Sequence, residues 1–407
     1  MKVALYYPWI YLTSGAERII LELSRRSRHD FVLFTNRYQP EQTFPGLQNQ
    51  RIVALDKVPI KRNVGSVAMA AWKILTQRIP LEDFDLLVVV CEGLGDLILF
   101  RNDSKPALCI CLTPLRPVFD PVYRSHVISR SSFLQKLLLK SASACFRRVD
   151  RPAWRRYSRI FCISEEVRRR VLEGGLAGPE KLEVLHPGLG IESQAISGWF
   201  KHFFLIPGRV MWTKNIELGI RALERFREVN PEFAEFRLII AGAVDEKSQP
   251  YYRKLQQEAA SIGNVQFRIF PSDEEMAALY RDCYAVLFTA FNEDWGIVPL
   301  EALTFGKPVI AVNSGGPRET IAHGRCGFLE DPEPEAFAKR MAELVRDPVM
   351  ATRMGQVGRI RAKKYSWDTF TSRIDQEIDT LGAKVPGRAQ FGESVALESC
   401  PQESLRN

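Results

Sequence analysis

The chain has 407 residues, of which 46% are hydrophobic and 26% charged, with 24 prolines and 26 glycines. This length allows two domains that each bury a core, and the composition excludes a disordered, collagen-like or coiled-coil protein. The net charge of +8 is local: residues 124–159 hold ten basic residues and one acidic residue, so this segment carries +9 and the rest of the chain −1.

Membrane-spanning and secreted proteins are also disfavoured. No apolar run reaches the roughly 18 residues that a spanning helix requires. The first residues, M-K-V-A-L-Y-Y-P-W, are typical of a buried strand and lack the pattern of a signal peptide. The eight cysteines include no Cys-x-x-Cys pair, and most lie in apolar runs. We therefore expect a reduced, cytoplasmic protein.

Short β-branched runs alternate with amphipathic stretches along the whole chain, which predicts an α/β protein. In the first half we expect strands at 3–7, 31–34, 86–90, 107–111, 160–163 and 182–185, and helices at 16–26, 67–76, 131–157 and 165–173. In the second half we expect strands at 203–206, 237–241, 265–268, 285–288 and 308–311. The helices expected there are 214–229, 250–261, 273–281, 299–305, 317–323, 334–346 and 348–364.

This rhythm predicts two Rossmann-like, doubly wound domains with ligands at the carboxyl ends of their strands, facing a cleft. The stretch 186–200 is rich in Gly, Pro and Ser, so we place the join there. The predicted division is 1–192 for the first domain and 193–366 for the second. We expect a further helix at 367–383, packing back toward the first domain, and a disordered tail at 384–407.

The strongest chemical signal is the stretch A-F-N-E-D-W-G-I-V-P-L-E, which carries Glu293 and Glu301 eight positions apart. Pro299 suits the first turn of a short helix, which places Glu301 in that turn. Backbone N–H groups of Gly296, Ile297 and Val298 would then point at an anion. The alternative is that Glu301 only complements the helix dipole. Val298, at the expected capping position, lacks a side-chain acceptor, and this favours a binding role.

A second signal is P-G-R-V-M-W-T-K-N, in which a strand ends at Gly208 and Arg209 and Lys214 precede the next helix. Cations at a helix N-terminus oppose its dipole unless an anion lies nearby. A planar arginine and a point-charge lysine suit a diphosphate. The alternative is a solvated lysine and an arginine paired with a carboxylate.

Two glycine turns complete the candidate set. Gly315 and Gly316 follow a strand and precede Pro317, so a phosphate or sugar could approach their backbone. Gly15 lies between the first strand and the first helix. Ser14 and Glu17 have capping-box spacing there, which offers a purely structural alternative.

Six stretches together resemble the retaining glycosyltransferases of family 4, also called glycosyl transferases group 1. They are G-A-E-R-I-I-L-E-L from Gly15, C-L-T-P-L-R-P-V-F-D from Cys111, I-F-C-I-S-E-E-V from Ile160, P-G-R-V with Lys214, the E-x7-E pair, and S-G-G-P-R-E-T-I from Ser314. The resemblance extends from about residue 3 to 380. It implies the GT-B fold, in which two Rossmann-like domains face a cleft.

The resemblance also implies a function: transfer of a sugar from a nucleotide-diphosphate-sugar to a glycan, lipid-linked sugar or polysaccharide precursor, with retention of configuration. Arg209 and Lys214 would bind the diphosphate and stabilise the leaving charge, and with Glu293 they are the predicted catalytic residues. Glu301 would bind the ribose, and Glu293 with the backbone of Asp294, Trp295, Gly296, Ile297 and Val298 would hold the sugar. Gly208, Gly315 and Gly316 would belong to the same donor site, with Gly15 closing over it. The co-substrate is a UDP- or GDP-sugar, and neither a metal nor another cofactor is implied.

Two departures from the family pattern keep alternatives open. Leu112 replaces the family's histidine in the Cys-His-Thr-Pro motif, and Ile269 stands where glycine is frequent. Leu112 favours the alternative of a partner subunit that binds a nucleotide sugar without turnover. A nucleotide-sugar epimerase is disfavoured by the E-x7-E pair. Nucleic acid is not an expected partner, because the basic segment carries no recognised motif.

The basic segment favours peripheral membrane binding instead. If 131–151 is one helix, Lys136, Lys140, Arg147 and Arg151 share a face. Phe133, Leu134, Leu137, Leu138 and Phe146 supply apolar area beside them, and Pro152 is expected to end the helix. We consider two interpretations: a helix packed on its leucines with a solvated basic side, or a face that docks on an anionic membrane, which would suit a lipid-linked acceptor.

Overall fold

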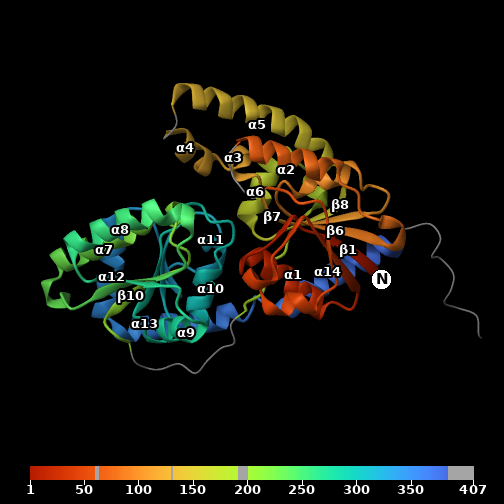
Figure 1. Cartoon of the computed structure of the whole chain (residues 1–407). Coiled ribbons are helices and arrows are strands. Elements are labelled where there is room, and N and C mark those ends of the chain that lie inside the picture. The colour runs from red at the N-terminus through yellow and green to blue at the C-terminus, as the bar shows by residue number, and fades with distance from the viewer. Residues whose placement is uncertain (60–63, 130–131, 191–199, 384–407) are drawn as a thin grey trace, which may run out of the picture.

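The computed structural model describes residues 1–59, 64–129, 132–190 and 200–383. Within these ranges two parallel sheets, each flanked by helices, form two lobes (Figure 1). The predicted α/β architecture with two Rossmann-like units is therefore confirmed. The domain boundary predicted at 192 and 193, and the tail predicted at 384–407, lie outside the described residues.

The first lobe contains a seven-stranded sheet in the order β5-β3-β1-β6-β7-β8-β9, and every neighbouring pair is parallel. Its strands are β1 (Lys2–Tyr6), β3 (Asp30–Thr35), β5 (Ile52–Ala54), β6 (Leu86–Gly93), β7 (Ala107–Pro114), β8 (Tyr157–Cys162) and β9 (Leu182–Val184). Its helices are α1 (Gly15–Arg26), α2 (Val64–Thr76), α3 (Arg116–Phe119), α4 (Pro121–Ser129), α5 (Phe133–Trp154) and α6 (Glu165–Glu173). A separate small pair joins β2 (Trp9–Ile10) to β4 (Arg37–Tyr38).

The second lobe contains a six-stranded parallel sheet in the order β12-β11-β10-β13-β14-β15. Its strands are β10 (Phe203–Pro207), β11 (Arg237–Gly242), β12 (Val265–Ile269), β13 (Ala285–Phe288), β14 (Val309–Val312) and β15 (Gly327–Glu330). Its helices are α7 (Ile216–Val229), α8 (Gln249–Ile262), α9 (Asp273–Asp282), α10 (Ile297–Thr304), α11 (Pro317–Thr320), α12 (Pro334–Arg346) and α13 (Pro348–Ala362).

The strand order reverses at the centre of each sheet, between β1 and β6 in the first lobe and between β10 and β13 in the second. Ligands of doubly wound folds bind outside the carboxyl ends of strands at this switch point. Helices cover both faces, so the central strands are continuous apolar runs; residues 86–91 of β6, for example, have no exposed surface. The candidate site therefore belongs to the loops after β1, β10 and β13.

The last helix, α14 (Trp367–Ala383), leaves the second lobe and lies beside α1 on the first (Figure 1). Arg373 donates to both carboxylate oxygens of Glu183 at 2.7 Å, and the carboxylate of Asp375 accepts hydrogen bonds from Ser27 and Arg28. These charge-assisted bonds join the last described helix to β9 and to the residues that follow α1.

Most sequence-based element predictions are confirmed within one to three residues, with three exceptions. The strands β2, β4, β5 and β15 are not foreseen, because two to four residues show no periodicity. The helix expected at 131–157 is α5, whereas the two short helices before it, α3 and α4, are not foreseen. Pro152 does not end α5, which continues to the buried Trp154. Among the described residues, no helix has both the length and the apolar composition needed to cross a bilayer.

Candidate active site

The loop after β10 begins with a conformation that favours glycine. Gly208 has φ +117°, and its N–H donates to Ala241 O at 2.8 Å. Arg209 follows, and a short 3₁₀ turn at Trp212–Lys214 precedes α7, as the sequence predicts. Two bonds then tie this loop to the one after β13: Thr289 Oγ1 donates to Lys214 O at 2.7 Å, and Phe291 N donates to Thr213 O at 2.9 Å. The second-lobe loops are therefore one connected unit.

This connection brings two of the predicted residues together. Lys214 Nζ lies 2.6 Å from Glu293 Oε2, and the side chains are 23% and 22% exposed. Burial alone would raise the pKa of Glu293, but Lys214, Arg116 and Arg209 together hold that pKa below its ordinary value. Glu293 is thus an ionised carboxylate among three cations, and one of these, Arg116, comes from the first lobe. Such a cluster can rearrange around an incoming anion.

Glu301 has a different environment. It lies in α10, which begins at Ile297 with Gly296 (φ +75°) as N-cap, so it occupies the second turn and not the first. The helix starts two residues earlier than predicted, because glycine readily adopts this left-handed conformation. Glu301 Oε2 accepts a hydrogen bond from Tyr280 OH at 2.6 Å. Burial raises the pKa of Glu301, although Tyr280 and Arg18 act in the opposite direction.

The space beside the glycine turn after β14 is occupied by the backbone of the loop that carries Glu293. Gly315 has φ +63°, and Gly316 N donates to Glu293 O at 2.9 Å. A Cβ at Gly315 would collide with the backbone of Glu293, and one at Gly316 with the carbonyl of Trp295. These glycines therefore let the loop that carries Glu293 approach closely. Whether a ligand also approaches them stays a prediction.

On the first lobe, the loop before α1 is organised differently from the predicted capping box. Ser14 is the N-cap of α1 but its side chain makes no capping bond. Instead the buried carboxylate of Glu17 accepts from Ser14 Oγ and from Leu12 N, the latter at 3.1 Å. The capping-box prediction is therefore wrong, because Glu17 holds the loop rather than the helix end. No atom lies within 4 Å of a Cβ built on Gly15, so this turn is open.

Two arginines from the first lobe donate hydrogen bonds to the loop that carries Glu293. Arg116 Nη2 donates to Asn292 O at 3.0 Å, and Arg170 Nη2 donates to the same oxygen at 2.9 Å. Arg170, which has no exposed surface, also forms an ion pair with Asp294. In return, Asn292 Nδ2 donates to Glu166 Oε1 at 3.0 Å. We call these residues, with Asp120, the interlobe clamp.

Every member of the clamp except Asn292 is a charged residue type, although the clamp is largely buried. Asp120 is fully buried, 2.8 Å from Arg116 and 3.4 Å from Arg170. Burial would raise the pKa of Asp120, but the two arginines hold it below its ordinary value. Arg170, Asn292 and Asp120 were not predicted from the sequence as positioning groups. Arg116 and Asp120 lie in the quoted Cys111–Asp120 stretch, but nothing local distinguishes Arg170 from the neighbouring arginines of α6.

The side chains of Asp294 and Trp295 are occupied by contacts to the first lobe and to the segment that follows β9. Asp294 pairs with Arg170, and its carbonyl accepts from Ser164 Oγ. Trp295 is 6% exposed and stacks on His186 at 4.5 Å between ring centroids. Only their backbone remains for the predicted role in donor binding. Leu112 is 7% exposed in β7, and the histidines that reach the interlobe region are His126 and His186.

Residues 195–361 match the family model described as glycosyl transferases group 1. Alpha-1,3/1,6-mannosyltransferase ALG2 of Mus musculus is 36% identical over 404 residues, which covers 90% of this chain and 93% of the relative. The chain belongs to the glycosyl transferases group 1 family. The human ALG2 is 34% identical over 218 residues, 49% of this chain and 52% of that protein. The predicted resemblance is therefore confirmed, and the chain is a glycosyltransferase.

Solved structures agree on the fold. The Anabaena protein Alr3699/HepE in complex with UDP has a TM-score of 0.70 at 18% identity, covering 93% of this chain and all of that one. This similarity confirms the GT-B architecture of two Rossmann-like domains. The epimerase, nucleic-acid and non-enzymatic alternatives are not favoured by any of these relatives. The roles of individual site residues stay predictions.

Proposed function

We propose that this glycosyltransferase takes its sugar from a nucleotide-diphosphate-sugar bound mainly by the second lobe. The observation that carries the proposal is the ionised Glu293, held 2.6 Å from Lys214 at the switch point of the second sheet, with Arg209 and Arg116 acting on the same carboxylate. A diphosphate entering this cluster would exchange contacts with Glu293 for contacts with Lys214 and Arg209. Glu293 would then be released toward the hydroxyls of the sugar.

Glu301 suits the ribose of the same donor. Its carboxylate is buried and oriented by the bond from Tyr280 at 2.6 Å. A buried carboxylate binds a pair of hydroxyls well because it accepts two hydrogen bonds in a water-poor site. The backbone of 294–298 and the turns at Gly208 and Gly15 would complete the donor site, in agreement with the family resemblance.

We propose transfer with retention. The bond between the anomeric carbon and the phosphate oxygen breaks as the acceptor oxygen attacks from the same face. The acceptor proton passes to the leaving phosphate oxygen, so charge and atoms balance without another base. Arg209 and Lys214 stabilise the charge that develops on the diphosphate, which is the largest contribution that a preorganised site makes. No metal takes part in this scheme.

Relatives suggest the sugar and the acceptor. The mouse and human proteins are named α-1,3/1,6-mannosyltransferases, and an Anabaena structure of this fold contains UDP-glucose. We therefore propose a mannosyl donor first and a glucosyl donor second. A mannose-containing, lipid-linked glycan is the acceptor class that we propose.

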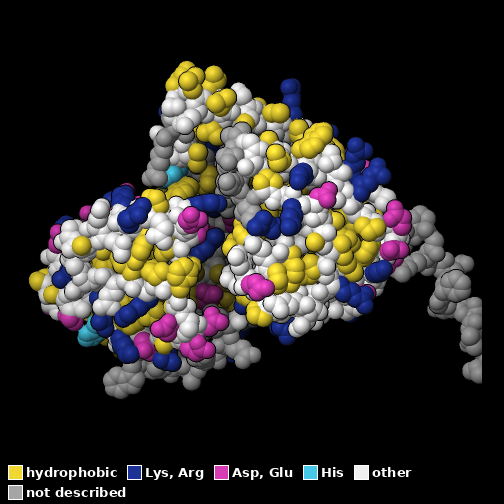
Figure 2. Space-filling model, viewed as in Figure 1, with side chains coloured by type: hydrophobic (Ala, Val, Ile, Leu, Met, Phe, Trp, Pro, Cys, Tyr) yellow, Lys and Arg dark blue, Asp and Glu magenta, His cyan; other side chains and the backbone are white. Residues whose placement is uncertain are grey.

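The exposed end of α5 supports a membrane-bound acceptor. Phe133, Leu134, Leu137 and Leu138 are 80%, 70%, 55% and 68% exposed. Figure 2 shows hydrophobic side chains gathered at the top of the molecule, where Figure 1 places the start of α5. The helix is thus not packed on its leucines. The basic face is smaller than predicted, because Arg147 donates to Val118 O and Arg151 donates to Gly174 O.

We propose that this end of α5 inserts its apolar residues into the interface of an anionic membrane while Lys136 and Lys140 meet the lipid headgroups. Vesicles of anionic lipid should bind the protein in a salt-dependent way. Lys136→Glu with Lys140→Glu should weaken binding, and Leu134→Ser with Leu138→Ser should abolish it at high salt. Equal binding of all variants, or no binding at low salt, would contradict this part of the proposal.

The donor is tested by a thermal-shift panel of GDP-mannose, UDP-glucose and other nucleotide sugars. A ligand at 100 times its Kd stabilises a protein by about 2.7 kcal/mol. Transfer to a mannoside, with an α-linked product by NMR and no effect of EDTA, would establish retention and metal independence. If no nucleotide sugar shifts the melting temperature, or Glu293→Gln changes neither binding nor transfer, the proposal fails.

Leu112 supports one second candidate, a partner subunit that binds the donor without turnover. That candidate predicts donor stabilisation with no transfer to any acceptor, and Leu112→His would then be expected to restore transfer. Transfer by the natural chain would exclude it.

A further inference from the structure

The residue before Glu293 has an uncommon backbone conformation. Asn292 has φ +40°, in the left-handed region that favours glycine, and it is 4% exposed. Asparagine visits this region more readily than most residues, but a folded protein keeps it there only where the surroundings fix it. Conformations of this kind are concentrated at active sites. The groups that fix Asn292 therefore bear on how Glu293 is placed.

The first lobe fixes Asn292 through both its backbone and its side chain. Its carbonyl oxygen accepts from Arg116 Nη2 at 3.0 Å and from Arg170 Nη2 at 2.9 Å. Its Nδ2 donates to Glu166 Oε1 at 3.0 Å and to Asp120 Oδ1 at 3.3 Å. These partners are charged residue types, and hydrogen bonds to charged groups are stronger than those between neutral groups. Residues of the first lobe thus hold a conformation in a loop of the second.

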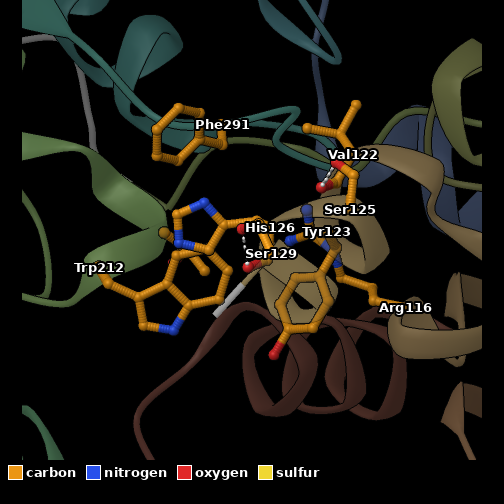
Figure 3. Close-up of a pocket in the computed structure, with 9 residues that line it drawn as sticks. Arg116, Val122, Tyr123, Ser125, His126, Ser129, Trp212 and Phe291 are labelled. Carbon is orange, nitrogen blue, oxygen red and sulfur yellow. Dashed lines mark hydrogen bonds between the residues drawn. The ribbon is translucent and has the colours of Figure 1, made fainter. Parts of the chain in front are cut away.

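The residues on either side contact the first lobe as well. The Phe291 ring lies 5.6 Å from the His126 ring of α4, at an interplanar angle of 40° (Figure 3). The carboxylate of Asp294 forms an ion pair with Arg170. The carboxylate of Glu293 instead faces the second lobe, where it forms the ion pair described above. The side chains that flank Glu293 are therefore held by one lobe, and its own carboxylate by the other.

We infer that Asn292 is a positioning residue, which orients Glu293 toward the sugar of the donor through the contact between the lobes. The inference rests on the proposed function, in which an arriving diphosphate releases Glu293 from Lys214. The direction of the released carboxylate then depends on the backbone from which it projects, and Asn292 sets this backbone. The nucleoside diphosphate binds to the second lobe, whereas recognition of the sugar also requires the first.

Two substitutions separate the backbone conformation of Asn292 from its side-chain bonds. Asn292→Gly removes the bonds from Nδ2 but keeps the conformation, which glycine adopts without steric cost. Asn292→Ala removes the same bonds and also disfavours the conformation, because its Cβ crowds the backbone there.

Isothermal titration of the full-length protein with GDP-mannose and with GDP isolates the contribution of the sugar. Because Asn292 bonds to charged groups, the Kd of GDP-mannose should rise about tenfold in Asn292→Ala and about threefold in Asn292→Gly. The Kd of GDP should change less than about twofold in both, since GDP lacks the sugar that Glu293 binds. A purely structural role would weaken both ligands alike. Equal weakening of the two ligands in Asn292→Ala, or no effect on either, would overturn the inference.

Asn264→Ala is the matched control. Asn264 also has a left-handed backbone, with φ +57°, and its Nδ2 donates to Ala234 O at 2.9 Å. It directly precedes β12, so it lies at the amino edge of the sheet, opposite the candidate site. Both Kd values should stay unchanged in this variant. A selective loss of GDP-mannose affinity here would contradict the role assigned to Asn292.

Glu293→Gln distinguishes the inference from the proposed function. It should show the same selective loss of GDP-mannose affinity as Asn292→Ala. If Glu293→Gln loses this affinity and Asn292→Ala keeps it, the inference fails and the proposed function stands. If Asn292→Ala loses it and Glu293→Gln keeps it, the proposed role of Glu293 fails, and the inference fails with it.

Discussion

The two lobes have the same order of central strands but present different surfaces to each other. The second lobe presents glycine turns and an ion pair, Lys214–Glu293, whose parts lie within short sequence motifs. The first lobe presents a carboxylate used for structure, Glu17, and arginines that reach across to Asn292 and Asp294. The candidate site of the second lobe is thus built from residues of that one lobe, whereas the first lobe acts through contacts between residues more than 100 positions apart.

The largest expected effect comes from removing the clamp. Arg170→Met leaves Asp120 and Glu166 without their buried partner, 3.4 and 3.2 Å away. Removing one member of a buried ion pair costs about 3–5 kcal/mol of stability. Thermal unfolding should show a clear fall in Tm. The control is Arg169→Met on the same helix, whose side chain is 47% exposed and whose ion pairs are worth at most about 1 kcal/mol. Equal effects of the two variants would contradict a buried clamp.

In the second lobe, the variant to compare with Arg170→Met is Lys214→Ala. Loss of one group that stabilises developing charge lowers kcat by about 10²–10³. Steady-state kinetics should show this loss. Lys201→Ala is the matched control, since Lys201 pairs with Asp282 at 2.7 Å but is 63% exposed and distant from the cleft. If Lys214→Ala affects only the KM of the donor, the lysine binds but does not stabilise the leaving group.

One glycine from each lobe allows the stability effect of an added methyl group to be compared directly. Gly316→Ala places a methyl group against the Trp295 carbonyl, and we expect a loss of about 1–3 kcal/mol because the neighbour is backbone and cannot yield. Gly15→Ala meets no atom within 4 Å and should stabilise the apo protein by about 0.4–1 kcal/mol. Thermal unfolding without ligand measures both. If Gly15→Ala also weakens donor binding, the open space at Gly15 belongs to the donor.

The smallest expected effect is that Glu293 and Glu301 make thermal stability depend on pH in opposite directions. The pKa of Glu293 is depressed in the folded state, so its ion pair stabilises the protein above the ordinary glutamate value of 4.5 and is lost as pH falls below it. The Tm difference between the natural protein and Glu293→Gln should therefore shrink from pH 7 to pH 4. The pKa of Glu301 is raised, so its ionisation opposes folding as pH rises. Glu301→Gln should gain stability relative to the natural protein as pH rises above 4.5. Parallel curves for the two variants would refute this assignment.

Sequence alone determined the features that depend on local pattern. Apolar runs and amphipathic stretches identified most strands and helices, since hydrophobic periodicity follows backbone geometry. The motifs around Gly208, Lys214 and Glu293 predicted a candidate site in the second lobe, and the structure places Lys214 against Glu293. Both residues follow strands that neighbour each other in one sheet, and parallel strands deliver their ends to the same edge.

Only the tertiary structure decided what depends on long-range contact. Ser14 and Glu17 have the spacing of a capping box, yet the carboxylate of Glu17 accepts hydrogen bonds from the preceding loop. A buried carboxylate needs hydrogen-bond donors, and tertiary packing determines which donors lie within reach. Arg170 resembles its neighbours in sequence and became the buried member of the clamp through the meeting of two lobes. Each of these features requires residues from both lobes or from folded loops, and no local pattern encodes such a meeting.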